Sequence, residues 1–384
     1  MTLGKSDGEL RAMLHNLMLS HLMTYSGHAA GAKDNELYAR WVQLGVWSPI
    51  LRLHNNENLW STKEPWEFSA STNMIVSNAL RYRHRLIPYL YTMNYISATT
   101  GIPIVRPLYY EHSSTNPTED GFYTYKQEFF FGSELFVIPI SAETERSSLC
   151  SQVLAWFPPG EWIDIATGVT YTGGREMLLH RTLEQYPVFA RPGSIVPLDG
   201  ASELENGAEN PQNLEVLLVI GADGVFHLHE DDGMGQTVDD VQAQTTVITY
   251  DQQNGQLTIN DGSSTKRTWR VRLLGYNGGL PDGARNTTEI TPSGMLVTLA
   301  ATADRVYTLS LGPNPLRIRV DPGPAIQELI ARAQIAYEAK TKLWTAVRSA
   351  TMATAVTGIM AVPLNGYIQA AIIELLLADA RVAV

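Results

Sequence analysis

The sequence predicts a chain of mixed class, in which an α/β part comes first, two all-β parts follow and a helical tail ends the chain. Three observations predict this order. Apolar residues recur at helical spacing near the amino end, short apolar runs broken by proline and glycine fill the middle, and helical spacing returns at the carboxyl end. We therefore expect domains at residues 1–126, 127–200, 201–320 and 321–384.

The α/β part runs over residues 10–112. Residues 35–47 (NELYARWVQLGVW) have helical spacing, and residues 70–101 predict one long helix that is capped among residues 69–73 and stops at Gly101. Residues 48–54 and 102–112 read as short buried strands on either side of that helix. A helix bracketed by two such strands is the repeating unit of a parallel sheet or barrel. We expect the helix to turn its basic residues to solvent or to a domain boundary: Arg81, Arg83, His84 and Arg85.

The two all-β parts are separated by a polar linker at residues 199–213. Before it, residues 128–140, 153–174 and 186–198 are apolar runs broken by proline and glycine. After it, residues 214–310 contain strands at the spacing of a β-sandwich. Asn254 and Gly255, between two alternating runs, predict a two-residue hairpin.

The tail begins near Pro324 and is expected to be helical. One helix face is predicted to carry Ile326, Leu329, Ile330, Ala333 and Tyr337. Residues 352–373 carry no charge and are long enough to span a bilayer. Pro363 and Gly366 interrupt this stretch, so a pair of helices folded against the body is the favoured interpretation.

Composition excludes several classes of function. With 44% hydrophobic and 17% charged residues, the sequence is that of a soluble globular protein. A net charge of −11 argues against a nucleic-acid partner, and no basic run is long enough to hold an anionic membrane. Cys150 is the only cysteine, which excludes an intrachain disulfide and a thiolate metal site. We find no phosphate-binding loop or dinucleotide fingerprint, so no cofactor is expected.

Compartment and oligomeric state are left open by the sequence. Residues 1–19 lack the pattern of a signal peptide, and the single cysteine fits a reducing compartment. The cytoplasm is therefore favoured, although an upstream leader would change that expectation.

Residues 48–68 (SPILRLHNNENLWSTKEPWEF) concentrate the candidate binding residues. Arg52 and His54 alternate along the apparent strand, so their side chains point the same way, into the mouth of a barrel if the strand belongs to one. Both can donate hydrogen bonds to hydroxyls or a carboxylate. Trp60 and Trp66 follow among polar residues, and indoles stack on the apolar faces of sugar rings. The alternatives are a surface salt bridge, a capping histidine and core tryptophans.

Residues 227–233 (HLHEDDG) contain histidines and carboxylates, which are typical metal ligands. Strand alternation places His227 and His229 on one face. The run lacks the spacing of a calcium loop, and a charged strand end that leads into a turn is the favoured interpretation. We therefore expect no metal site.

Seven segments occur in one order: NELYARWVQLGVWSPILRLHN, KEPWEF, LRYRHRLIPYLYTMNY, GIPIVRPLYYEH, FFFGSELFVIPI, PPGEWIDIATGVTYTGG and YPVFARPGSIVPL. Together they strongly resemble the carboxy-terminal portion of glycoside hydrolase family 31, the α-glucosidase and α-xylosidase family, over residues 34–315. The resemblance implies the last part of a (β/α)₈ barrel followed by two β-domains, and retaining, exo-acting hydrolysis of α-linked glucosides or xylosides. It also implies that His54 hydrogen-bonds the sugar in the cleavage subsite, with Arg52 beside it.

The chain departs from the family at the catalytic positions. The nucleophile and acid/base aspartates of the family lie upstream of the resembling region, so we identify no catalytic residue here. Gly27 and His28 keep their places, but Thr24 stands where relatives carry a sugar-binding aspartate. Asp7 does not match the acid/base pattern. A complete barrel needs about 250 residues, and the α/β part here spans only residues 10–112.

Three hypotheses follow from this comparison. The chain is a glycosidase in a truncated form that is inactive alone, a non-catalytic carbohydrate-binding or structural remnant, or a subunit that completes its barrel with another chain. The choice between glucose and xylose is left open.

Overall fold

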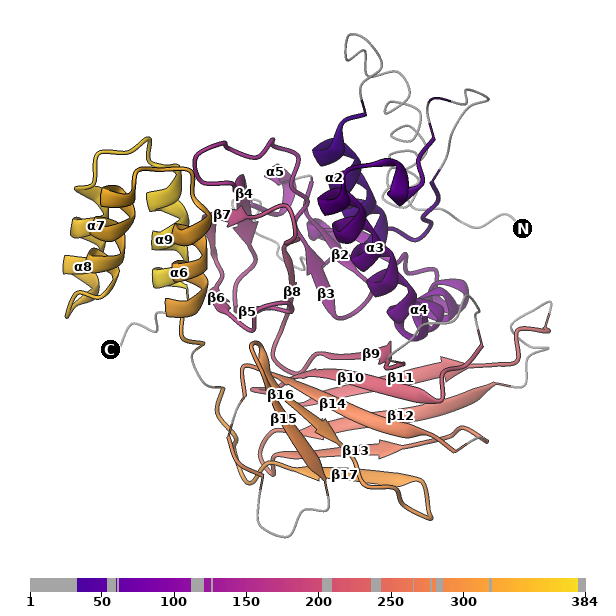
Figure 1. Cartoon of the computed structure of the whole chain (residues 1–384). Helices are drawn as coiled ribbons and strands as arrows, with labels where there is room; N and C mark the ends of the chain where they lie inside the picture. Colours follow the sequence, from indigo (N-terminus) through magenta and orange to yellow (C-terminus); the bar gives the residue numbers. More distant parts are fainter. Residues whose placement is uncertain are drawn as a thin grey trace.

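A computed structural model describes residues 33–53, 60, 62–111, 121–125, 127–201, 209–235, 243–264, 266–276, 278–280, 286–317 and 320–378. In Figure 1 the first helices lie above a β-sandwich, a second β-region lies beside them, and the helical tail packs against that region. The expectations for Asp7, Thr24, Gly27, His28 and His54 concern residues outside the described ones.

The helices of the amino-terminal part form largely where the sequence places them. They are α2 (Asn35–Val46), a 3₁₀ turn η1 (Pro65–Glu67), α3 (Ala70–Arg85) and α4 (Ile87–Thr100). Ser69 caps α3 by accepting a hydrogen bond from the backbone N–H of Thr72, and Gly101 ends α4 in the left-handed region, with φ 76°. Both ends of the predicted long helix are thus confirmed. Its continuity is not, because Pro88 has no N–H to donate and the helix breaks at Leu86.

The predicted strand–helix–strand unit is not observed among the described residues. Residues 51–53 form no strand. The second expected strand is shortened to β1 (Val105–Pro107), which pairs antiparallel with β2 (Phe129–Phe131) and not with a parallel neighbour. The apolar run after Gly101 therefore contributes an edge strand to the following β-region, because the phenylalanine run supplies its closest pairing partner.

The second β-region is a six-stranded sheet of order β1-β2-β3-β8-β5-β6 with a two-stranded sheet, β4-β7, beside it. The strands not yet given are β3 (Leu135–Val137), β4 (Ser151–Phe157), β5 (Glu161–Asp164), β6 (Thr170–Thr172), β7 (Arg175–Arg181) and β8 (Val188–Ala190). Its core is aromatic: Phe136 packs on Trp162 and Phe157, with ring centroids 5.0 and 5.7 Å away. The short helical turns η2 (Leu108–Glu111) and α5 (Gly121–Thr124) lie at its margin.

The sandwich consists of a five-stranded sheet, β15-β16-β14-β10-β9, and a four-stranded sheet, β11-β12-β13-β17. Its strands are β9 (Ile195–Asp199), β10 (Asn213–Val219), β11 (Gly224–Glu230), β12 (Gln244–Asp251), β13 (Gln256–Asn260), β14 (Thr268–Leu274), β15 (Thr287–Thr291), β16 (Gly294–Thr298) and β17 (Val306–Ser310). The hairpin predicted at Asn254 and Gly255 forms between β12 and β13. Its loop is longer than predicted and spans residues 252–255, with Gly255 at φ 60°.

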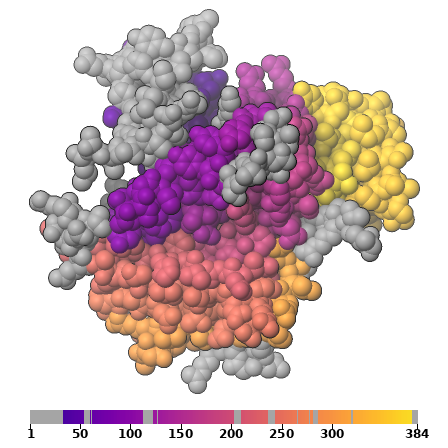
Figure 2. All heavy atoms as spheres, turned by 180° about the vertical axis from the view of Figure 1, so that it is seen from behind, coloured from indigo at the N-terminus to yellow at the C-terminus, as the bar shows by residue number. Residues whose placement is uncertain are grey.

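The amino-terminal helices and the sandwich share one core. Tyr89 of α4 packs on Phe226 of β11 with ring centroids 5.9 Å apart. Thr92 Oγ1, also on α4, accepts a hydrogen bond of 3.1 Å from the backbone N–H of His229. Arg85 of α3 forms an ion pair of 3.0 Å with the buried Glu215 of β10. Figure 2 shows the helices lying directly on the sandwich.

The tail forms four helices, α6 (Gly323–Arg332), α7 (Tyr337–Val347), α8 (Met352–Met360) and α9 (Tyr367–Leu377). The predicted apolar face is buried at its first four positions, but Tyr337 is 83% exposed. The reason is that α6 ends at Arg332, so the helical spacing does not continue to Tyr337. The uncharged stretch at residues 352–373 folds as the expected helix pair. Among the described residues, none of the helices has the length and apolar character that crossing a membrane requires.

Candidate functional site

The predicted binding residues lie on the segment between α2 and α3. Arg52 is exposed, and the indoles of Trp60 and Trp66 are 87% and 71% exposed. His54 lies outside the described residues. The structure therefore places three of the four predicted residues at the surface of one segment, and their contact with a sugar stays a prediction.

The start of this segment is held by Arg83 of α3. Its guanidinium donates two hydrogen bonds, of 2.8 Å to the carbonyl of Val46 and of 2.9 Å to the carbonyl of Pro49. Burial lowers the pKa of Arg83 to about 10, so the side chain stays charged at neutral pH. Arg83 is thus an internal clamp that joins α3 to the end of α2 and the residues after it, a role that its place in a run of basic residues does not reveal.

The end of the segment is held by a second set of contacts. Tyr38 of α2 stacks on Phe68 with ring centroids 3.8 Å apart, and its hydroxyl donates a 2.5 Å hydrogen bond to the carbonyl of Lys63. Lys33 lies 5.2 Å from the centre of the Phe68 ring and forms a 3.2 Å ion pair with Glu67. Because Trp66 lies between Lys63 and Phe68, these contacts fix its backbone while its ring remains in solvent.

These supporting residues carry no distinctive signal in the sequence. Tyr38 fits the buried face of α2 by spacing alone, and Phe68 stands between a tryptophan and a cap residue. Their pairing depends on how the segment folds back onto α2, which no local pattern specifies.

The motif at residues 227–233 forms a structural network. His229 is buried and stacks on Tyr95 of α4, with ring centroids 3.6 Å apart and planes 9° from parallel. Glu230 accepts two hydrogen bonds, of 2.6 and 2.8 Å, from the buried Arg267. His227 is exposed, so the two histidines do not share an environment. Within the described part of the chain, no group of three or more histidine, cysteine or acidic side chains could hold a metal ion.

Comparison with known proteins places the chain in a family. The model described as the glycosyl hydrolases family 31 TIM-barrel domain matches residues 8–93, and that of the family's C-terminal domain matches residues 101–196. This chain belongs to glycoside hydrolase family 31. Its lineage is that of glycosidases, and Trp60 and Trp66 lie inside the first matched segment.

Relatives with assigned names are longer enzymes. An α-xylosidase of Saccharolobus solfataricus is 29% identical over 236 residues, which are 61% of this chain and 30% of the relative. Neutral α-glucosidase C of Mus musculus is 32% identical over 212 residues, which are 54% of this chain and 22% of the relative. The family 31 chain described here therefore spans less than a third of the length of either relative.

Solved structures agree on the fold. A dextranase of Flavobacterium johnsoniae from the same family, complexed with glucose, aligns with a TM-score of 0.59 at 21% identity, over 72% of this chain and 37% of that one. An α-xylosidase of Xanthomonas citri aligns with a TM-score of 0.51 at 25% identity, over 70% and 27%. The shared coverage extends the fold likeness beyond residue 196, where the family-model matches end.

Proposed function

We propose that this chain supplies a substrate-contacting surface and the supporting β-domains of a glycosidase that acts on α-linked glucosides or xylosides. The proposed reaction is exo-acting hydrolysis with retention, in which one carboxylate attacks the anomeric carbon and a second protonates the leaving oxygen. The names of the relatives, α-xylosidase and α-glucosidase, support the substrate class.

The exposure of two tryptophans is the observation that assigns the proposed sugar contact to particular residues. Trp60 and Trp66 expose 87% and 71% of their area on a segment whose two ends are held by buried contacts. Water solvates an indole poorly, and the ring buries about 150–250 Å² when it packs. A sugar ring offers the matching apolar face, and its hydroxyls can accept hydrogen bonds from Arg52 and His54.

We further propose that the 384-residue chain by itself has negligible turnover. The double displacement needs two carboxylates about 5–5.5 Å apart, and we assign neither of them to a residue of this chain. Binding and cleavage would then be separable: this chain would bind sugar without cutting it. A non-catalytic carbohydrate-binding role is the second candidate. It is favoured by the same observation, that neither cleavage carboxylate is assigned to a residue of this chain.

Titration calorimetry with methyl α-glucoside, methyl α-xyloside and maltose tests the binding surface. Loss of one stacking contact of about 0.5–1.5 kcal/mol weakens binding roughly two- to tenfold, so Trp60→Ala and Trp66→Ala should each show that loss. Tyr337→Ala is the matched control, because Tyr337 is an equally exposed aromatic on the tail. Unchanged affinity in both tryptophan variants would show that Trp60 and Trp66 do not contact the sugar.

Turnover is tested separately with an aryl α-glucoside and an aryl α-xyloside. No release of the aryl group above the blank is expected from this chain. Clear hydrolysis would contradict the proposal that it lacks the cleavage carboxylates.

A further inference from the structure

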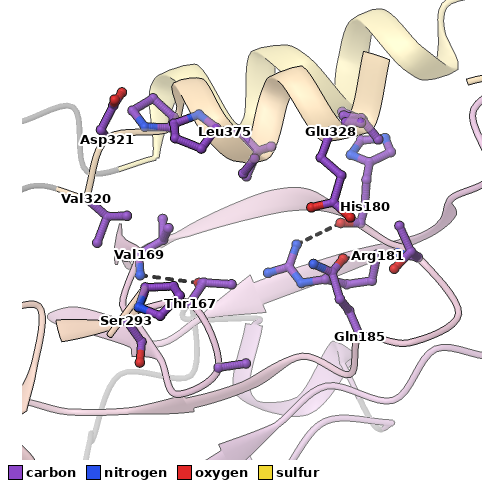
Figure 3. A pocket seen from close by; sticks show the side chains of 18 of the residues that line it. Thr167, Val169, His180, Arg181, Gln185, Ser293, Val320, Asp321, Glu328 and Leu375 are labelled. Atoms are coloured by element: carbon purple, nitrogen blue, oxygen red, sulfur yellow. Dashed lines mark hydrogen bonds between the residues drawn. The ribbon is translucent and has the colours of Figure 1, made fainter. Parts of the chain in front are cut away.

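A cavity of about 610 Å³ lies where the tail meets both β-regions. Residues of β7 and the loop after it form one wall, the turn between β15 and β16 forms another, and α6 and α9 face them. Figure 3 shows Arg181 and Gln185 on the strand side, Thr167 and Ser293 on the turn side, and Glu328 and Leu375 on the helices. The residues assigned to sugar binding above contribute nothing to this cavity.

Arg181 gives the cavity a buried donor. The residue is 5% exposed, and its two terminal nitrogens are occupied by Asp164 at 3.0 Å, Glu374 at 2.8 Å, Tyr171 and a backbone carbonyl. Its Nε–H has no acceptor among the described residues, although the residue lines the cavity. This N–H is not among the buried unpartnered atoms of the described residues, so it is open to the cavity and can donate a hydrogen bond to an acceptor of a ligand.

Hydroxyl groups surround the rest of the opening. Ser293 is 7% exposed, and among the described residues its Oγ has no hydrogen-bond partner. Thr167 Oγ1 accepts a 3.3 Å bond from the backbone N–H of Val169, which leaves its own proton to donate. Hydroxyls both donate and accept, so they suit a ligand that does the same. Apolar lining, such as Val169 and Leu375, offers contact for C–H groups.

The charges around the cavity select against ions. Asp164 and Glu374 lie behind Arg181, so an anion at Nε would approach two carboxylates. A cation beside Arg181 would meet the guanidinium itself, and of the two lining carboxylates, Glu328 already faces Arg332 at 3.6 Å and Asp321 accepts a 2.9 Å bond from the backbone N–H of Gly323. Arg332, at the opening, is paired with Glu184 at 2.8 Å and with Glu328 at 3.6 Å. The most favourable ligand is therefore neutral and carries hydroxyl oxygens.

We propose that this cavity is a second binding site, separate from the Trp60–Trp66 surface, for a small neutral saccharide or polyol. Its helical wall lies beyond both segments that the family models match. A ligand here would touch the tail and both β-regions together and would hold the tail in place.

The test fills the cavity from an exposed position. Ala325 of α6 is exposed and lines the cavity, whereas Gln327 is exposed on the same helix and does not line it. Ala325→Trp should abolish one class of maltose or xylose sites in calorimetry, and Gln327→Trp should leave it unchanged. Both variants are also made in a Trp60→Ala, Trp66→Ala double-mutant background, so that stacking on the loop tryptophans cannot account for the signal.

Two further measurements keep the inference testable. Ser293→Ala leaves the cavity open but removes one hydroxyl, and it should weaken binding about fivefold. Glucose 6-phosphate should bind more weakly than glucose, because its phosphate would meet the carboxylates behind Arg181. Equal binding in wild type and Ala325→Trp, or tighter binding of the phosphate ester, would overturn the proposal even if the loop surface binds sugar as expected.

Discussion

Glu374 is the buried carboxylate among the contacts that attach the tail, which makes Glu374→Gln an informative change. The side chain of Glu374 on α9 is 7% exposed. It accepts hydrogen bonds of 2.8 Å from Arg181, 2.6 Å from the backbone N–H of His180 and 3.0 Å from the hydroxyl of Tyr171. A glutamine keeps one acceptor but turns an NH₂ group toward these donors, and it leaves Arg181 with Asp164 as its only carboxylate partner.

The expected cost follows from the geometry. Breaking a buried ion pair by removing one partner costs about 3–5 kcal/mol. We expect the lower end, about 3 kcal/mol, because Asp164 still neutralises Arg181. If the tail opens locally, that cost raises its opening constant roughly 100-fold. Amide hydrogen exchange in α9 should accelerate by the same factor.

Glu338→Gln is the control, because Glu338 is exposed on α7 and its change should leave exchange in α9 within about twofold. If Glu374→Gln exchanges no faster than this control, the buried cluster contributes no net stability and the reasoning fails.

The same cluster predicts a pH dependence. Burial alone would raise the pKa of Glu374, but Arg181 and His180 outweigh it and hold that pKa below its ordinary value. The stabilisation is therefore present above the ordinary glutamate pKa of about 4.3 and is lost as the pH falls through the lowered one. The exchange rate of α9, divided by the intrinsic amide rate at each pH, should therefore rise in acid for the wild type and much less for the variant.

Three more changes give distinct outcomes. Gly132→Ala should lower the free energy of unfolding in urea by about 3 kcal/mol or more, because the new Cβ would lie 2.2 Å from the hydroxyl of Tyr89. Gly101→Ala is also at positive φ but in open space, so it should lower that free energy by only about 1–2 kcal/mol. Burial raises the pKa of Glu128 to about 8, so the folded state retains a proton that the unfolded state loses, and stability should fall as the pH rises from the ordinary glutamate value toward 8. Glu128→Gln should remove that fall, which unfolding midpoints at pH 5 and pH 9 would show. Arg83→Ala should speed hydrogen exchange of the amides in residues 50–53, because it removes the two hydrogen bonds to Val46 and Pro49. Arg81→Ala, a change at an exposed residue of the same helix, should not. Equal effects of the two changes would argue against the clamp.

Local signals in the sequence predicted local structure well. The cap at Ser69, the stop at Gly101 and the helix pair in the uncharged stretch of the tail all follow from chemistry within a few residues. The break at Leu86 was equally local, and Pro88 was the signal for it. Apolar residues continue on both sides of the break, so their spacing alone predicts one helix.

Pairing over distance could not be predicted in the same way. The run that forms β1 has the composition of a barrel strand, yet it pairs antiparallel with β2, since a short apolar run does not specify its neighbour. Arg83 and Tyr38 hold the candidate surface through contacts that cross from one element to another. Trp60 and Trp66 are candidates because each indole stands among polar residues in the sequence; the structure shows that both are exposed, and their contact with a sugar stays a prediction.

The contact between α4 and β11 has a consequence for self-association. β11 is the outermost strand of its sheet, and Thr92 occupies a backbone N–H on the side away from β12. A helix from one part of the chain thus covers a strand edge of another, where a second copy could otherwise add a strand. A shortened chain that begins after Gly101 would keep every strand of the sandwich but uncover that edge. Such a chain is expected to pair with itself through β11, so the first helices protect against aggregation and also support the segment that carries Trp60 and Trp66.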